Sequence, residues 1–139
     1  MKPNLILITS IATGLVLSGL SHAESLVDGI YLSGGDDNGK GKCTLSLKST
    51  NSANKYGDET FELESSGDGS CEWSALGISK SYAITAGMVT NAGAPAFVKI
   101  SFPFGPAGNN IEVTTIDLDG TLRNSDSFVK QQANLTGGD

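Results

Sequence analysis

Both cysteines of this chain lie in short runs where apolar and polar residues alternate, and this feature constrains the fold most. Cys43 opens one run at 43–48, Cys71 opens another at 71–75, and a third run lies between them at 60–64. A period of two is typical of antiparallel strands with one buried face. It places both cysteines on predicted core faces, where two sulfurs can meet. The sequence therefore predicts three strands cross-linked by a Cys43–Cys71 disulfide.

Similar runs recur along the rest of the chain, separated by stretches rich in glycine, asparagine and proline. They predict further strands at 29–33, 80–89, 96–104, 111–118 and 121–130, and the part of the chain after its N-terminal apolar stretch shows no helical period. We expect an all-β fold, a small antiparallel barrel or sandwich of about seven to eight strands with one disulfide. Periodicity alone leaves the choice between barrel and sandwich open.

Three local features of these strands lead to specific expectations. One strand aligns Tyr82 with Ile84, so both side chains are expected in the core. In a later strand the apolar phase slips between Val113 and Ile116, which indicates a β-bulge. Asp119–Gly120 predicts a two-residue hairpin turn.

Residues 1–23 have the features of a secretory signal peptide. Lys2 provides a positive start, an apolar stretch follows, and small residues precede the expected cleavage point after Ala23. Cleavage leaves a single β domain at 24–139, whose tail is expected to fray from about residue 131. We expect a periplasmic or secreted protein with no membrane segment after cleavage.

Cleavage also removes the only histidine, His22, and lowers the number of basic residues. Without histidine one chain cannot form a Ser-His-Asp triad, a Cys-His dyad or a His-ligated zinc site, so we predict no catalytic residue, metal or cofactor. The full chain has 9 basic and 15 acidic residues, and loss of Lys2 leaves a net charge of −7. This charge disfavours nucleic acid and suits a cationic protein partner, although it also suits solubility alone.

Residues 117–122, with the sequence Asp-Leu-Asp-Gly-Thr-Leu, resemble the nucleophile signature of haloacid-dehalogenase-type phosphatases. The resemblance implies an attacking Asp117, an acid–base Asp119 and a bound Mg²⁺. In that family the motif opens a large α/β domain, whereas here 17 residues follow Leu122 without a βαβ pattern. We therefore interpret the motif as a strand that ends in a hairpin turn.

Calcium binding at Asp36, Asp37, Asp117 or Asp119 is another alternative, because these carboxylates lie in or beside turns. Neither run fits the EF-hand loop, which needs acids at alternate positions, a central glycine and a closing glutamate. We interpret both runs as solvated acidic turns, and the sequence leaves calcium binding open.

Ser66–Gly67, which precedes a strand containing Trp73, is similar to the Ser-Gly loop of small bacterial periplasmic lysozyme inhibitors. Proteins of that family are exported β-barrels, often disulfide-bonded, whose loop enters the catalytic cleft of the enzyme. The resemblance implies a partner-binding site at Ser65, Ser66, Gly67, Asp68 and Gly69. The same stretch also suits an ordinary turn before a core tryptophan, and the apolar loop at 102–106 is a further candidate contact.

These expectations combine into an exported, non-catalytic domain that binds another protein. The most specific form is an inhibitor or immunity-type partner of a cationic cell-wall hydrolase, whose cleft a loop would block. The alternative is a structural subunit of a surface appendage or adhesin. An enzyme that works with carboxylates alone is a third hypothesis, for which the sequence singles out no pair of acids. The oligomeric state is left open.

Overall fold

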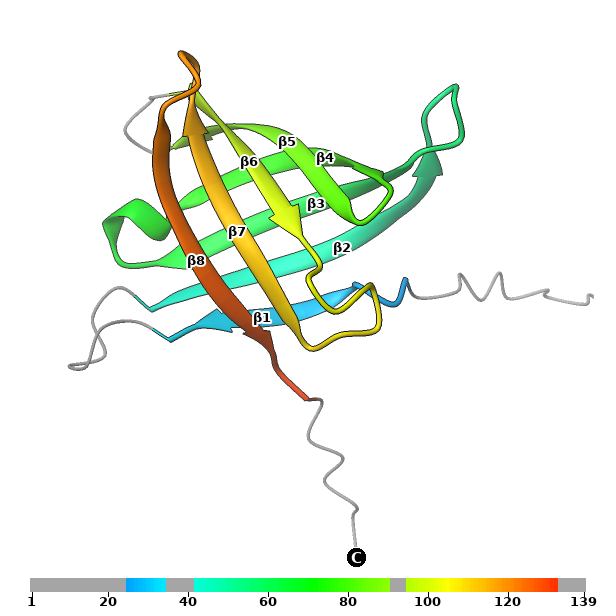
Figure 1. The fold of residues 1–139 in the computed structure, drawn as a ribbon, viewed down its shortest axis with the longest axis horizontal. Helices are drawn as coiled ribbons and strands as arrows, with labels where there is room; N and C mark the ends of the chain where they lie inside the picture. The colour runs from blue at the N-terminus through cyan, green and yellow to red at the C-terminus, as the bar shows by residue number, and fades with distance from the viewer. Residues whose placement is uncertain (1–24, 35–41, 91–94, 133–139) are drawn as a thin grey trace, which may run out of the picture.

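Eight antiparallel strands form a closed barrel in the computed structural model, which describes residues 25–34, 42–90 and 95–132 (Figure 1). Each strand pairs with its neighbour in sequence, and β8 closes the barrel by pairing with β1. The elements are β1 (Gly29–Ser33), β2 (Cys43–Ala53), β3 (Glu59–Gly67), the 3-10 turn η1 (Gly69–Cys71), β4 (Trp73–Lys80), β5 (Ala83–Thr90), β6 (Pro95–Ser101), β7 (Asn110–Asp117) and β8 (Leu122–Lys130). The predicted all-β fold is confirmed, and the architecture is the barrel.

Alternate residues of the strands fill the interior, as the period-two pattern predicts. Leu47 lies beside Leu63 across β2 and β3, and Ile84 lies beside Ile100 across β5 and β6. Gly77 belongs to this packing, because a Cβ there would lie 2.5 Å from Ile84 Cγ2. The buried apolar cluster consists of Val27, Tyr31, Leu45, Leu47, Phe61, Leu63, Trp73, Ile84, Ala86, Met88, Ala96, Val98, Ile100, Phe102, Ile111, Val113 and Phe128.

Tyr31 connects the segment before β1 to this core through its buried ring and a hydrogen bond. Its ring is buried, and its hydroxyl donates a hydrogen bond of 2.7 Å to the carbonyl oxygen of Val27. Burial, and then the nearby charge of Asp28, raise the pKa of Tyr31 to about 12. The phenol therefore stays protonated in the folded protein at neutral pH.

The predicted disulfide joins the first residue of β2 to the last residue of η1. The Cα atoms of Cys43 and Cys71 are 5.3 Å apart. Gly67 lies directly against the bridge, because a Cβ at this position would be 2.5 Å from the Lys42 carbonyl oxygen and 3.3 Å from Cys71 Sγ. The bond is consistent with folding in an oxidising, exported environment.

The expectation that Tyr82 belongs to the core is wrong. β4 ends at Lys80 and β5 begins at Ala83, so the two residues between them form a tight turn and Tyr82 is 67% exposed. Ser81 accommodates this turn with a φ of 57°. The alternating pattern counted Tyr82 as a strand residue because the turn contains neither glycine nor proline.

The β7–β8 hairpin has the predicted bulge and a longer turn than predicted. The register shifts between Thr115 and Ile116. β7 ends at Asp117 and β8 begins at Leu122, so four residues connect the strands instead of two. Gly120 has a φ of 90° and donates its N–H to the Asp117 carbonyl oxygen at 2.9 Å. The Asp-Gly pair therefore shapes the turn, as predicted, within a longer connection.

Alternate connections of such a barrel lie at the same end. We call one end the disulfide end, because the β3–β4 connection with η1 lies there together with the β7–β8 turn. The opposite end carries the β2–β3, β4–β5 and β6–β7 connections, and the β2–β3 hairpin projects from it (Figure 1). Within the three described ranges, no helix has the length and apolar character needed to cross a membrane.

Candidate functional site

The predicted contact at 65–69 lies at the disulfide end and is divided between β3 and the turn after it. Ser65 points into the barrel between Leu45 and Trp73, is 8% exposed, and its hydroxyl has no hydrogen-bond partner. The remaining residues of the prediction, Ser66, Gly67, Asp68 and Gly69, are exposed. A hydrogen bond of 2.7 Å from the Cys71 N–H to the Asp68 carbonyl oxygen and the adjacent disulfide hold the turn. This stretch therefore presents a short, cross-linked turn.

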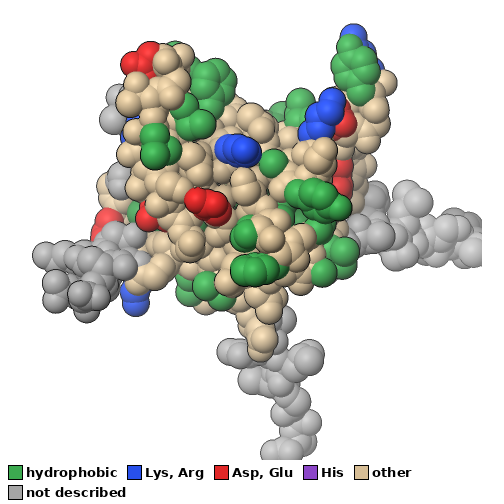
Figure 2. Space-filling view, in the orientation of Figure 1, with side chains coloured by type: hydrophobic (Ala, Val, Ile, Leu, Met, Phe, Trp, Pro, Cys, Tyr) green, Lys and Arg blue, Asp and Glu red, His purple; other side chains and the backbone are tan. Residues whose placement is uncertain are grey.

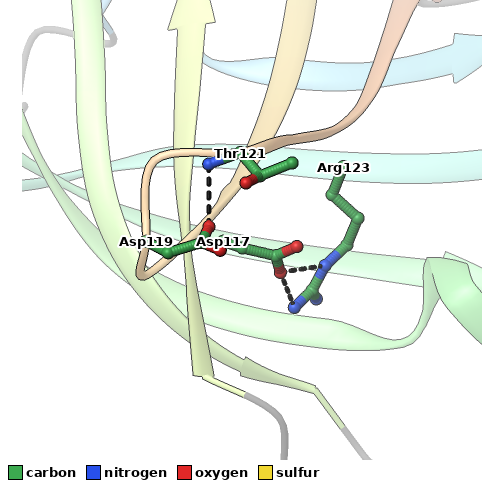
Figure 3. A network of polar contacts seen from close by, with 4 residues as sticks. All are labelled: Asp117, Asp119, Thr121 and Arg123. Atoms are coloured by element: carbon green, nitrogen blue, oxygen red, sulfur yellow. Dashed lines mark hydrogen bonds and ion pairs between the residues drawn. The ribbon is translucent and has the colours of Figure 1, made fainter.

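The phosphatase-like motif forms the β7–β8 turn at the same end, where its carboxylates hold the hairpin (Figure 3). Asp119 Oδ1 accepts the Thr121 N–H at 2.9 Å, and this bond lowers the pKa of Asp119 below its ordinary value. Asp117 forms an ion pair with Arg123, whose Nε donates to Asp117 Oδ1 at 2.7 Å. Both acids thus have structural partners within the β7–β8 hairpin.

No group of three or more metal-ligating side chains occurs among the residues that the structure describes. Asp117 and Asp119 are the part of the calcium alternative that can be located, and they lie on the β7–β8 hairpin. Asp36 and Asp37, the other part, lie outside the described residues.

The projecting β2–β3 hairpin is a surface feature that the sequence pattern did not predict. We call residues 50–59 the arm. β2 has 11 residues and β1 has five, and their pairing ends at Gly29 and Leu47, so β2 continues beyond its neighbour. Figure 2 shows the arm standing out from the barrel, with hydrophobic and basic side chains at its tip. The arm is therefore a convex element that a concave partner surface can accept.

Asn54 organises the tip of the arm through five hydrogen bonds. Its side-chain oxygen accepts the N–H groups of Tyr56 at 2.8 Å and Asp58 at 3.0 Å, and its amide nitrogen donates to Asp58 Oδ2 at 3.0 Å. Its backbone N–H donates to the Asp58 carbonyl oxygen, and its carbonyl accepts the Gly57 N–H. Gly57 completes the turn with a φ of 84°. The tip is consequently braced by hydrogen bonds among its own backbone and side-chain groups.

The ordered tip presents Lys55 and Tyr56 to solvent. Tyr56 is 76% exposed, the largest exposure among the large hydrophobic residues that the structure describes. The Lys55 Nζ lies 4.9 Å from the centroid of the Tyr56 ring, which is within the range of a cation–π contact. The tip therefore combines one ring and one positive charge.

Polar side chains also brace the root of the arm. Asp28 Oδ1 accepts the Ser49 N–H at 2.7 Å, at the point where pairing with β1 ends. Ser49 Oγ donates to Glu59 Oε1 at 2.6 Å, and the hydroxyls of Thr50 and Thr60 are in contact. A pocket of about 380 Å³ opens beside this root, between the start of β1 and the outer part of β2; it is lined by Asp28, Gly29, Ile30, Ser46, Leu47, Lys48, Ser49 and Asn51.

Two other connections at the end of the barrel that carries the arm, which we call the arm end, also expose an aromatic ring. Phe104, in the loop at 102–106, is 74% exposed, and Tyr82 lies in the β4–β5 turn. These connections are joined by a hydrogen bond of 3.2 Å from the Phe102 N–H to the Tyr82 carbonyl oxygen. Phe102 itself is buried, so only part of the predicted apolar loop is available for contact. The exposed loop aromatics of the described chain thus lie at the arm end, away from the turn at 65–69.

Comparison with protein-family models, curated proteins and solved structures finds no match to this chain. The molecule is thus defined by its own features, as an eight-stranded antiparallel barrel with one disulfide and a projecting, internally braced hairpin.

Proposed function

We propose that this protein is an exported, non-catalytic domain that binds another protein. In its most specific form, the protein inhibits a cell-wall hydrolase of the lysozyme type, or protects against it, by placing the arm in the catalytic cleft. The observation that carries the proposal is the ordered, exposed tip of the arm, where Asn54 holds Lys55 and Tyr56 in place.

The construction of the arm favours binding over simple connection of two strands. A hairpin can be closed by two residues, whereas this one has a longer tip with a dedicated hydrogen-bond network. A loop that is ordered before it binds loses less conformational entropy on docking. Tyrosine is among the residues that most often dominate the energetics of protein interfaces. An exposed Tyr56 on a fixed backbone therefore has the properties of an interface anchor.

The charges of the arm suit the cleft of an enzyme that cleaves glycosidic bonds. Such enzymes work with a pair of carboxylates in the cleft, so a cation at an inserted tip meets opposite charge. Lys55 supplies this cation. Glu59 lies at the root of the same arm, where it suits a basic rim around the cleft. These charges support the arm as the contact in our proposal, and the turn at 65–69 is the rival contact at the opposite end.

Inhibition assays with variants of the two ends test the proposal. The purified protein is titrated into a lysozyme that is digesting peptidoglycan. We expect inhibition by the wild type, and a loss of potency of at least about 30-fold for Tyr56→Ala, the range of an interface hot spot. Lys55→Glu is expected to weaken inhibition as well, because it places a carboxylate among carboxylates.

The matched variants for the rival contact are Ser66→Ala and Asp68→Asn at the disulfide end. Retained inhibition in these variants supports the arm. Loss of inhibition in them, with full potency in Tyr56→Ala, would assign the contact to the turn at 65–69. Absence of inhibition by the wild type across lysozymes would reject the specific form of the proposal.

The alternative of an appendage subunit gains no support from the architecture. Subunits that assemble by strand donation need an open sheet edge to receive the donated strand. In this protein β8 pairs with β1 and closes the sheet. We therefore retain the binding domain as the proposal.

A further inference from the structure

The pocket beside the root of the arm has the chemistry of a second binding site. It has a volume of about 380 Å³ and lies where the pairing of β1 with β2 ends and β2 continues into the arm. Asp28 and Lys48 place opposite charges in its lining, and Ser46 and Asn51 add a hydroxyl and an amide. The pocket therefore contains several polar groups that can recognise a charged ligand.

Asp28 keeps one carboxylate oxygen available in this pocket. Its Oδ1 accepts the N–H of the buried Ser49 at 2.7 Å, whereas its Oδ2 has no hydrogen-bond partner among the residues that the structure describes. An amide can cap a backbone N–H equally well, because the side-chain oxygen of Asn54 accepts two of them at the tip of the arm. The carboxylate at position 28 thus adds a negative charge that the cap alone does not require.

The charges around the pocket favour a positively charged ligand. Glu62 and Glu64 are exposed on β3, the neighbour of β2. Together with Asp28 they outnumber the ammonium group of Lys48, which is the cross-strand partner of Glu62. Lys130 also lies near the start of β1, but its Nζ already donates to a backbone carbonyl oxygen at 3.0 Å. A cation that enters the pocket therefore meets a net negative environment.

We propose that this pocket receives an arginine side chain from the rim of the cleft that holds the arm, an inference that rests on the proposed function. β2 lines the pocket and then continues into the arm, so a partner that takes up the arm places its rim over the pocket. A guanidinium group donates several hydrogen bonds in one plane. Asp28 Oδ2, the Ser46 hydroxyl and the Asn51 side-chain oxygen are acceptors in the lining without partners among the described residues. Ile30, which is 39% exposed, gives the apolar stem of the arginine a surface to pack on.

NMR titration with Nα-acetyl-arginine amide tests the chemistry of the pocket without a protein partner. The guanidinium group is the only charge of this probe, and the citrulline analogue has nearly the same shape without the charge. We expect saturable shifts of the backbone amide signals of residues 46–51 with the arginine probe, at about millimolar concentration, and none with the citrulline probe. Asp28→Asn retains an oxygen that can accept the Ser49 N–H, so it should keep the wild-type thermal midpoint and bind the arginine probe at least about tenfold more weakly.

Asp126→Asn is the matched control, because it removes one exposed carboxylate from β8, outside the lining of the pocket. This control is expected to bind the arginine probe like the wild type. An absence of saturable shifts overturns the inference. Equal shifts with the two probes overturn it as well, and so does an Asp28→Asn variant that binds the arginine probe like the wild type.

Inhibition of a lysozyme by the same variants separates this inference from the proposed function. Where the wild type inhibits, Asp28→Asn should lose at least about tenfold in potency, and Asp126→Asn should match the wild type. Equal potency of the wild type and Asp28→Asn overturns the pocket as a contact and leaves the proposed function intact. If the wild type inhibits no lysozyme while the arginine probe binds at the pocket, the specific form of the proposed function fails and the preference of the pocket for a guanidinium group stands.

Discussion

Replacing both Cys43 and Cys71 with alanine is expected to lower the free energy of unfolding by about 3.6 kcal/mol at 25 °C. The disulfide joins residues with a sequence separation of 28. In the chain-entropy model, a loop of this size removes about 12 cal/mol/K from the unfolded ensemble. β2, β3 and β4 are paired along their length by their backbones, so we expect their native contacts to persist when the bond is removed. The effect should therefore arise mainly in the unfolded state.

Urea denaturation of the wild type and the double alanine variant measures this loss. With slopes of about 1–3 kcal/mol/M, the midpoint should fall by between about 1 and 4 M. The slope should also increase, because an unfolded chain without the cross-link exposes more surface. Wild-type protein unfolded in the presence of reductant provides the matched control, since it contains the same residues without the bond.

A loss below about 1 kcal/mol would refute the chain-entropy argument for this bridge. A variant whose dispersed NMR spectrum collapses without denaturant would refute the claim that native strand pairing is independent of the bond.

Three further predictions concern the core. Tyr31 has a pKa raised from 10.0 to about 12 in the fold, so its contribution to stability is complete below pH 10 and is lost as the pH rises through 12. The difference in unfolding free energy between the wild type and Tyr31→Phe, measured by urea titration, should therefore shrink between pH 10 and pH 12. Gly77→Ala should destabilise the fold by about 1–3 kcal/mol, because its Cβ would meet Ile84 Cγ2, and an unchanged thermal midpoint would contradict this packing. Ser65→Ala removes a buried hydroxyl without a partner and should raise stability by about 1 kcal/mol in urea titrations, whereas a loss would indicate a partner for that hydroxyl.

The strands could be predicted because burial of one sheet face leaves a direct record in the sequence. Leu45 and Leu47, for example, alternate with polar residues and are fully buried. The disulfide followed from the same pattern. Closure of the barrel could not be predicted, because it depends on pairing between β1 and β8, which are far apart in sequence. Periodicity reports which face of a strand is buried and gives no information about its neighbour.

The arm could not be predicted because polar residues are found both in loosely solvated loops and in turns ordered by internal hydrogen bonds. The stretch around Asn54 has the composition of a solvated loop, yet its side chains bond to one another and to the backbone. The sequence signal for the arm is a single aromatic residue, Tyr56, in a polar stretch that contains asparagine and glycine. For Ser65 the prediction differs from the structure in the other direction. This serine was predicted to contact a partner, but its side chain points into the barrel on the same face as Leu63.

Binding of the purified protein to a lysozyme, with and without an oligosaccharide that fills the catalytic cleft, tests the central claim most directly. Titration calorimetry should detect binding to the free enzyme and a marked loss of apparent affinity when the oligosaccharide is present, because the arm and the sugar would compete for one cleft. Binding that is unchanged by the oligosaccharide would contradict insertion of the arm. A lack of heat with every lysozyme tested would contradict the assignment of this enzyme class as the partner.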